Sequence, residues 1–359
     1  MPRYACLCLL ICATLSGCAS VGYGLQAVGG HLDVMARREP VTRVLARPDT
    51  RPALRESLAR AQDMRHFAAR ELGLPDNDSF RSYADLDRPY VVWNVVATPA
   101  LSLKPRSWCF FFVGCIEYRG YFRETSARAY AAKLAATGMD VTVGGVAAYS
   151  TLGWFADPLL DNQIDWPAYR LAGLIFHELA HQQVYVRNDS AFNESFASAV
   201  ELAGMGRWLA TQKDPALIAA YQVEQQRQRD FLALVSATRK RLKVTYAGTG
   251  DEKSKLAAKA AAFAAMRADY QKLRARWGGY AGYDRWFGDG LNNARLAAVH
   301  TYQQWVPAFM QILREADGDF PRFYAAVEKL SRLPRKERDA ALRAAVDRAR
   351  KSGSEHIFG

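Results

Sequence analysis

Two histidines with a glutamate between them are the residues whose types and spacing could perform chemistry in this sequence. His177, Glu178 and His181 follow the pattern His-Glu-x-x-His. Side chains four residues apart on a helix share one face, so both imidazoles can reach one metal ion. Neutral imidazole suits zinc, and three protein ligands leave one position open for water or substrate. Glu178 lies beside this face, where its carboxylate can take a proton from that water.

Apolar residues surround the motif. They are Leu174, Ile175, Phe176, Leu179 and Ala180. A helix of this composition is expected to be buried, and burying two histidines and a glutamate without a partner costs free energy. The sequence therefore favours a bound metal ion as that partner. The alternative is a buried polar cluster without metal, or an inactive relative of an enzyme.

A second helix is expected to begin near Asn193, after the turn residues Asn188 and Asp189. The run Asn-Glu-Ser-Phe-Ala that starts at Asn193 resembles the Asn-Glu-x-Phe-Ala motif of the zinc aminopeptidases, a group of gluzincin peptidases. Twelve residues separate His181 from Glu194. This link is shorter than in the best-known gluzincins, so the chain has to turn tightly between the two helices.

The gluzincin resemblance implies a role for each matching residue. His177, His181 and Glu194 would hold one Zn²⁺ ion per chain, and Glu178 would act as general base and then as general acid. Asn193, directly before the third ligand, would support the ligands from a second layer.

Over most of its length the chain is also similar to a family of bacterial lipoproteins described as zinc aminopeptidases. The similar stretches are Trp108-Cys109 with Cys115, and residues 118–122, 177–181, 193–197, 291–302 and 306–309. This similarity implies a peptide substrate and cleavage at its amino end. The segment by which well-known zinc aminopeptidases grip the substrate amine has no clear counterpart, and residues 143–147 occupy roughly its place.

Three further side chains are candidates for supporting roles. Glu201 lies two turns after Glu194, where it can orient a zinc-binding histidine or can be an ordinary surface carboxylate. Catalysis also needs a donor that faces the developing oxyanion. Tyr302 and His300, on a helix expected from about Asn292, are the candidates, with Tyr302 preferred. Either residue can instead be an ordinary core or surface residue.

The N-terminal residues predict export. A positive start is followed by an apolar run over residues 4–16, which is shorter than the roughly 20 residues that span a bilayer. The run ends in Leu-Ser-Gly-Cys, which resembles the lipobox of bacterial lipoproteins. The resemblance implies a signal peptide over residues 1–17 and a lipid on Cys18 that tethers the protein to the cell envelope. Ala19 favours the outer membrane, facing the periplasm; ordinary secretion is the alternative.

Two cysteines are left in the mature chain if this maturation occurs. Cys109 and Cys115 flank a short strand-and-turn segment. In an oxidising compartment, cysteines this close in a hairpin-like segment are expected to form a disulfide. Two buried free thiols are the alternative.

The positive charge of the chain suggests attraction to anionic surfaces, but not to nucleic acid. The formal net charge is +12, but no nucleic-acid-binding motif accompanies it, so we expect no nucleic-acid partner. Much of the charge lies on helical segments near the C-terminus, which form a solvated face or contact anionic lipid.

The periodicity of the sequence predicts an α+β fold that is mostly α. Residues 18–165 are expected to form a small α/β lobe, and residues 166–359 a helical lobe with a long hairpin over about 214–277. A zincin-like active site would lie between the lobes, next to an edge strand near residues 146–152 along which a peptide can pair. The sequence therefore predicts a tethered zinc aminopeptidase. A zinc endopeptidase and a non-catalytic envelope-binding lipoprotein are the alternatives.

Overall fold

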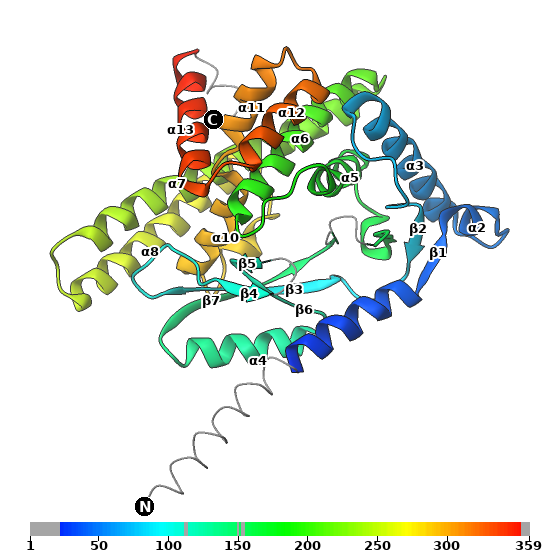
Figure 1. The fold of residues 1–359 in the computed structure, drawn as a ribbon. Helices are drawn as coiled ribbons and strands as arrows, with labels where there is room; N and C mark the ends of the chain where they lie inside the picture. Colours follow the sequence, from blue (N-terminus) through cyan, green and yellow to red (C-terminus); the bar gives the residue numbers. More distant parts are fainter. Residues whose placement is uncertain (1–21, 111–113, 149–150, 152–154, 353–359) are drawn as a thin grey trace, which may run out of the picture.

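The protein is described by a computed structural model, over residues 22–110, 114–148, 151 and 155–352. The predicted signal peptide and Cys18 lie outside these ranges. The described part of the chain is mostly helical with small sheets, which confirms the expected fold class (Figure 1). None of its helices combines the length and the apolar character needed to cross a membrane.

A three-stranded antiparallel sheet lies below the helices in Figure 1. Its strands are, in order, β6 (Arg119–Tyr121), β3 (Val92–Pro99) and β7 (Met139–Val146). Trp93, Val95 and Ala97 of β3 pack against α4 (Glu124–Ala135), which covers the lower face. Side chains alternate along a strand, so Asn94 and its neighbours on β7 face the opposite side, toward α10 (Asn293–Gln303).

β7 is the edge strand of this sheet within the described residues. The edge was expected near residues 146–152, but the strand already ends at Val146. Val146 pairs with Val92, the first residue of β3, and the next carbonyl, that of Ala147, accepts a hydrogen bond of 2.9 Å from Gln163 Nε2. Residues 149, 150 and 152 lie outside the described ranges.

Two smaller strand groups flank this sheet. β1 (Arg38–Pro40) pairs with β2 (Ser82–Ala84), and β2 pairs in parallel with β8 (Leu159–Leu160). β4 (Trp108–Phe110) and β5 (Gly114–Ile116) form a hairpin. The short helix α2 (Val41–Ala46) follows β1.

One hydrophobic core joins the helices above the sheet. These helices are α3 (Pro52–Leu72), α5 (Ala168–Gln183), α6 (Ser190–Thr211), α11 (Val306–Glu315), α12 (Phe320–Ser331) and α13 (Arg335–Lys351). α3 contributes a buried stripe that includes Leu58, Met64 and Leu72. Gly204 of α6 makes room for Leu72, whose side chain lies 2.6 Å from where a β-carbon would stand. The core therefore joins α3, from the first part of the chain, to helices that follow residue 166.

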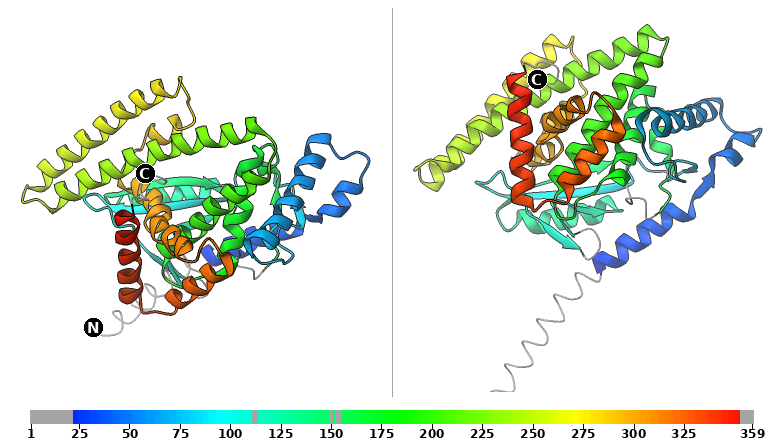
Figure 2. Two further views of the ribbon diagram at one scale, coloured as in Figure 1. Left: turned by 90° about the horizontal axis from the view of Figure 1, so that it is seen from above. Right: turned by 45° about the horizontal axis from the view of Figure 1, so that its top comes forward.

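A long helical hairpin projects from the body of the molecule (Figures 1 and 2). It consists of α7 (Pro215–Ala247) and α8 (Glu252–Arg276), close to the bounds expected from the sequence. Asp214 and Asp251 cap the two helices by accepting hydrogen bonds from backbone N–H groups in their first turns. The short helix α9 (Asp284–Phe287) packs against the hairpin through Phe287.

The C-terminal helix α13 is joined to the turn between α5 and α6 by a buried ion pair. Arg338 donates to Asp189 Oδ2 from Nε at 3.1 Å and from Nη2 at 2.7 Å. The two side chains are 5% and 2% exposed. Asp189 also caps α6, because its other carboxylate oxygen accepts a hydrogen bond of 3.2 Å from Phe192 N. The ion pair thus fixes the start of the helix that carries Glu194.

We expect Arg338→Ala to lower the free energy of unfolding by about 3–5 kcal/mol, because it leaves the Asp189 carboxylate buried without its counter-charge. Arg332→Ala is the matched control, since Arg332 and its partner Glu328 are 73% and 57% exposed. Such an exposed pair contributes less than about 1 kcal/mol. Urea unfolding of both variants measures the difference, and equal losses would contradict the role of the buried pair.

Candidate metal centre

Two neighbouring helices bring the His-Glu-x-x-His motif and Glu194 together. α5 carries His177 and His181 one turn apart, and their rings lie nearly perpendicular with centroids 4.9 Å apart. Glu194, in the second turn of α6, places Oε2 3.5 Å from Nε2 of each histidine. Ligands around a tetrahedral zinc ion at about 2.1 Å lie about 3.4 Å from one another. The spacing of these donor atoms therefore fits a metal ion.

The three side chains form a group that can hold a metal, with donor atoms within 4.8 Å of one another. The chemistry of the group agrees with its geometry. Burial opposes the charged form of His177, but hydrogen bonds with Glu194 and Glu201 outweigh burial and raise its pKa well above its usual range. Burial also opposes ionisation of Glu194, yet the two histidines lower its pKa to about 2. The site thus stabilises a positive charge between its ligands, as a divalent cation requires.

Glu201 contacts the back of a candidate ligand. Its Oε2 lies 3.1 Å from Nδ1 of His177, opposite the nitrogen that faces Glu194. Gly173, one turn before His177 on α5, leaves the space for this carboxylate, since a β-carbon there would stand 3.0 Å from Glu201 Oε1. A hydrogen bond to the far nitrogen fixes both the tautomer and the orientation of a ligand histidine. Of the two interpretations of Glu201, the structure favours the supporting one.

Glu178 lies on α5 between the histidines and is 9% exposed. Burial raises the pKa of its carboxyl group, and the nearby histidines oppose this shift. A buried carboxylate with a raised pKa is a better proton acceptor than a solvated one. Its position beside the ligand group suits a general base.

Asn193 organises the turn between the helices. Its side chain accepts from Val186 N at 2.7 Å and donates to Val186 O at 2.8 Å. A supporting role beside the ligands was expected for Asn193, and the hydrogen bonds show that it acts on the backbone of the turn. Asn188 completes the turn in a left-handed conformation with φ of 66°. These contacts explain how so short a link returns Glu194 to the histidines.

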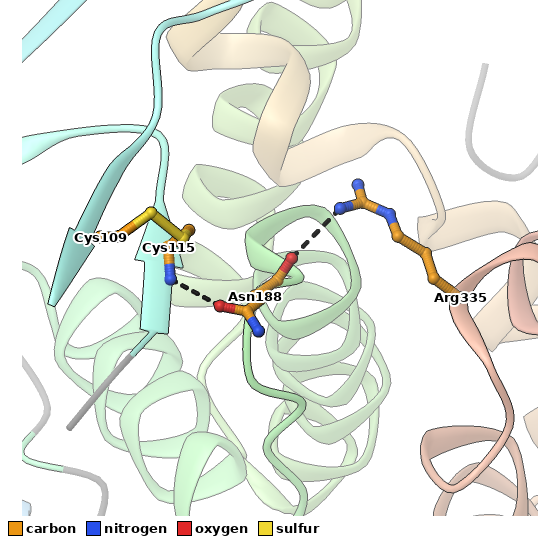
Figure 3. The surroundings of a disulfide bond; sticks show 4 residues. All are labelled: Cys109, Cys115, Asn188 and Arg335. Carbon is orange, nitrogen blue, oxygen red and sulfur yellow. Dashed lines mark hydrogen bonds between the residues drawn. A yellow bond between two sulfur atoms is a disulfide. The ribbon is translucent and has the colours of Figure 1, made fainter. Parts of the chain in front are cut away.

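The turn is also held from outside by the β4–β5 hairpin (Figure 3). A disulfide joins Cys109 of β4 to Cys115 of β5. The backbone N–H of Cys115 donates to Asn188 Oδ1 at 2.6 Å, and Arg335 of α13 donates to the Asn188 carbonyl at 3.2 Å. Gly114, with φ of +79°, allows this approach, since a β-carbon there would stand 2.3 Å from Asn188 Oδ1.

Tyr302 lies next to the histidines. Its ring stacks with that of His177 at a centroid distance of 6.4 Å. Ser195 of α6 fixes this end of α10, because its hydroxyl donates to the Tyr302 carbonyl at 3.4 Å and accepts from Trp305 N at 3.0 Å. The negative charge of Glu194 raises the pKa of Tyr302 well above its usual range, although the residue is 37% exposed. The phenol therefore stays protonated and can donate a hydrogen bond.

Tyr118 is a second tyrosine near the site, and it was not among the residues expected there. Burial raises its pKa, and Glu194, Tyr185 and Glu178 add to this shift. Its neighbour Glu117 accepts a hydrogen bond of 2.8 Å from Thr301, directly before Tyr302. The sequence contained a signal for Tyr118, which begins residues 118–122, one of the stretches on which the sequence resemblance rests.

His300 does not face the candidate metal centre. Burial and the nearby cations Arg239 and Lys243 of α7 lower its pKa to about 4. Two residues apart on a helix correspond to about 200° of rotation, so His300 and Tyr302 point to nearly opposite sides of α10. The ring contact between Tyr302 and His177 supports the preference for Tyr302 as the oxyanion donor, and the role of His300 stays a prediction.

Asp157 is a further buried carboxylate that the sequence did not reveal. It is 3% exposed, and Thr151 N donates to its Oδ2 at 2.9 Å. Burial raises its pKa to about 7, and the charge of Glu178 adds to this effect. Its backbone carbonyl accepts from Phe80 N at 2.7 Å. Asp157 thus adds an acidic group to the surroundings of Glu178.

Comparison with known proteins places the chain in a family. Residues 22–342 match the model of the family described as "Putative aminopeptidase". The chain belongs to this family. No curated protein and no solved structure matches it. Family membership indicates a hydrolase that binds peptides, and the group of His177, His181 and Glu194 is where a metal ion would be held.

The contact between Glu201 and His177 predicts an effect on metal affinity. Glu201→Ala should weaken binding of a divalent metal about 10- to 100-fold, because His177 loses the partner that orients it. Glu328→Ala removes an exposed glutamate on α12 and serves as the control. Competition between the protein and a chromophoric chelator for Co²⁺ measures the affinity. If both variants bind the metal equally well, Glu201 has no supporting role.

Proposed function

We propose that the protein is a zinc-dependent aminopeptidase tethered to the bacterial envelope. The observation that carries the proposal is the convergence of His177, His181 and Glu194, with Glu178 buried beside them, in a member of an aminopeptidase family. Two imidazoles and one carboxylate form a donor set typical of catalytic zinc sites. A zinc ion held there would polarise the scissile carbonyl and lower the pKa of water.

The protein's own residues divide the remaining tasks. Glu178 accepts a proton from the attacking water and delivers it to the amine that leaves. Its raised pKa helps both transfers, because the protonated form persists long enough to donate. Tyr302 donates a hydrogen bond to the oxygen on which negative charge develops, with Tyr118 as a second donor. The negative charge of Glu194 keeps the phenol of Tyr302 protonated, and burial together with that charge does the same for Tyr118.

The substrate would lie along β7. An extended peptide can pair with an exposed sheet edge and present its backbone to the site. At Gly144 no atom lies within 4 Å of where a β-carbon would stand, so the strand surface is open there. Cleavage from the amino end requires a free α-amino group. A peptide and its N-acetylated form should therefore differ strongly in rate, whereas equal cleavage would identify an endopeptidase.

The tether is proposed from the sequence alone. Cys18 lies four residues before the first described residue, Gly22. Cleavage before Cys18 and its acylation would attach the protein to the outer membrane, since several acyl chains together anchor stably. Mass spectrometry of the exported protein tests this, and an N-terminus without lipid would reject it.

The central test of the function separates metal binding from proton transfer. Glu178→Gln keeps the shape of the side chain but cannot accept a proton, so kcat/KM for a peptide should fall at least about a hundredfold. Metal content should stay at the wild-type level, because Glu178 is not among the proposed ligands. Metal analysis and peptide cleavage are measured on the same preparation. Full cleavage by the variant would exclude Glu178 as the base, and loss of metal would make it a ligand.

Tyr302 and His300 provide a matched pair on one helix. Tyr302→Phe removes only the phenol hydroxyl and should lower kcat about 10- to 1,000-fold with little change in metal content. His300→Phe alters a side chain that faces α7 and should leave kcat close to the wild-type value. Steady-state kinetics of both variants tests the assignment. If only the His300 variant loses activity, the oxyanion donor has been assigned to the wrong side of α10.

A further inference from the structure

The helix over residues 22–36 carries an exposed apolar stripe. Leu25, Val28 and Leu32 are 68%, 59% and 60% exposed. Their i, i+3, i+7 spacing places them on one face of the helix. Gly22, Gly29 and Ala36, on the same face, are also exposed and uncharged. The solvent-facing side of a surface helix usually carries charged and polar residues, so an apolar and uncharged stripe there is unusual.

The opposite face of the same helix is held firmly by the central sheet. Gln26 donates to Gly120 O at 3.3 Å and accepts from Phe122 N at 3.2 Å, so it covers the free edge of β6. Tyr23 contacts Tyr121 edge to face, with ring centroids 5.5 Å apart. Gly30 lies against Phe122, whose ring would stand 2.1 Å from a β-carbon there. These contacts fix the rotation of the helix and turn its apolar stripe away from the sheet.

Cations flank the stripe, although some of them are paired with acids. Arg38, which is exposed, follows the helix, whereas Arg37 is paired with Asp33 at 2.9 Å. α4, whose first turn lies near the start of this helix, carries Lys133 on its exposed side and pairs Arg128 with Glu124. Arg119 connects the two helices, since its guanidinium lies 4.0 Å from the Tyr23 ring centroid and 4.6 Å from that of Tyr130 on α4. An apolar stripe with cations around it suits an anionic lipid surface.

The stripe lies close in sequence to the predicted lipid attachment site, which indicates that a membrane surface covers it. Gly22 is four residues after Cys18, and four extended residues reach at most about 14 Å. A lipid on Cys18 therefore holds this helix next to the bilayer. We propose that Leu25, Val28 and Leu32 lie in the lipid interface, so that the N-terminal helix rests on the membrane surface. Three apolar side chains bind weakly by themselves, and their effect is to orient a protein that its acyl chains already hold.

This orientation has a consequence for the active site. α4 and the N-terminal helix lie on the side of the central sheet away from α5 and α10 (Figures 1 and 2). With the stripe on the membrane, the helices that carry the metal ligands face the aqueous compartment. Without this contact, a tethered chain would rotate freely and the candidate metal centre would have no fixed orientation relative to the membrane.

The test uses the exported, acylated protein reconstituted in vesicles of phosphatidylethanolamine and phosphatidylglycerol. Val28→Cys and Val244→Cys, each labelled with an environment-sensitive fluorophore, form a matched pair, because Val244 is 71% exposed on α7. We expect the label at position 28 to shift to the blue and to be quenched by a lipid-bound quencher, and the label at position 244 to do neither. Equal behaviour of the two labels overturns the proposal.

A second pair of variants measures the affinity of the stripe for lipid without the acyl chains. Leu25→Ser lowers the partitioning of the mature, unacylated chain into the same vesicles about tenfold if the leucine enters the lipid. Leu256→Ser, on exposed Leu256 of α8, leaves partitioning unchanged. The partitioning experiment uses a chain without acyl groups, so its outcome does not depend on the acylation of Cys18. The proposed orientation does rest on that acylation. A blue shift at position 28 that grows with protein concentration without vesicles identifies a second copy as the occupant and overturns the proposal.

Discussion

The carboxylate of Glu194 has to lie between two histidines of the preceding helix, and a link of twelve residues has to bring it there. A buried acid next to two imidazoles is stable only when each position is fixed to within a fraction of an ångström. The turn between α5 and α6 cannot achieve this with its own backbone alone. Asn193 supplies two hydrogen bonds to Val186, and Asp189 caps the helix that carries the carboxylate. The contacts around this turn therefore compensate for the shortness of the link.

Parts of the chain that are distant in sequence meet at this turn for the same reason. The disulfide-linked hairpin donates a hydrogen bond from Cys115 to Asn188, and α13 contributes Arg335 and Arg338. The C-terminal helix, far from the chemistry in sequence, thus influences it through Asp189. The same hairpin leads into Glu117, which accepts a hydrogen bond from α10. The next residue, Tyr118, lies near the carboxylates of Glu194 and Glu178. The hairpin thus links the turn before Glu194 to Tyr118 and to Thr301, the neighbour of Tyr302.

The sequence could predict what depends on spacing along one element. The shared face of His177 and His181, the long hairpin and the mostly helical fold class follow from local periodicity. What depends on tertiary approach could not be predicted in this way. The target of Asn193 is a backbone turn, and the position of Asp157 beside Glu178 requires β8 and α5 to be in place. The choice between Tyr302 and His300 depends on both kinds of information, because helical geometry separates the two side chains by about 200° and tertiary contacts decide which side faces Glu194.

The candidate metal centre is acidic, although the chain as a whole is basic. The chain has a net charge of +12, yet the candidate metal centre gathers Glu178, Glu194 and Glu201 around two histidines. A cluster of acids in low-dielectric surroundings attracts a divalent cation and the ammonium group of a peptide. Elsewhere cations are paired with acids, as Arg128 is with Glu124 at 2.6 Å on α4. The charge that a cation or an ammonium group would meet is therefore set by the local cluster of acids and not by the net charge of the chain.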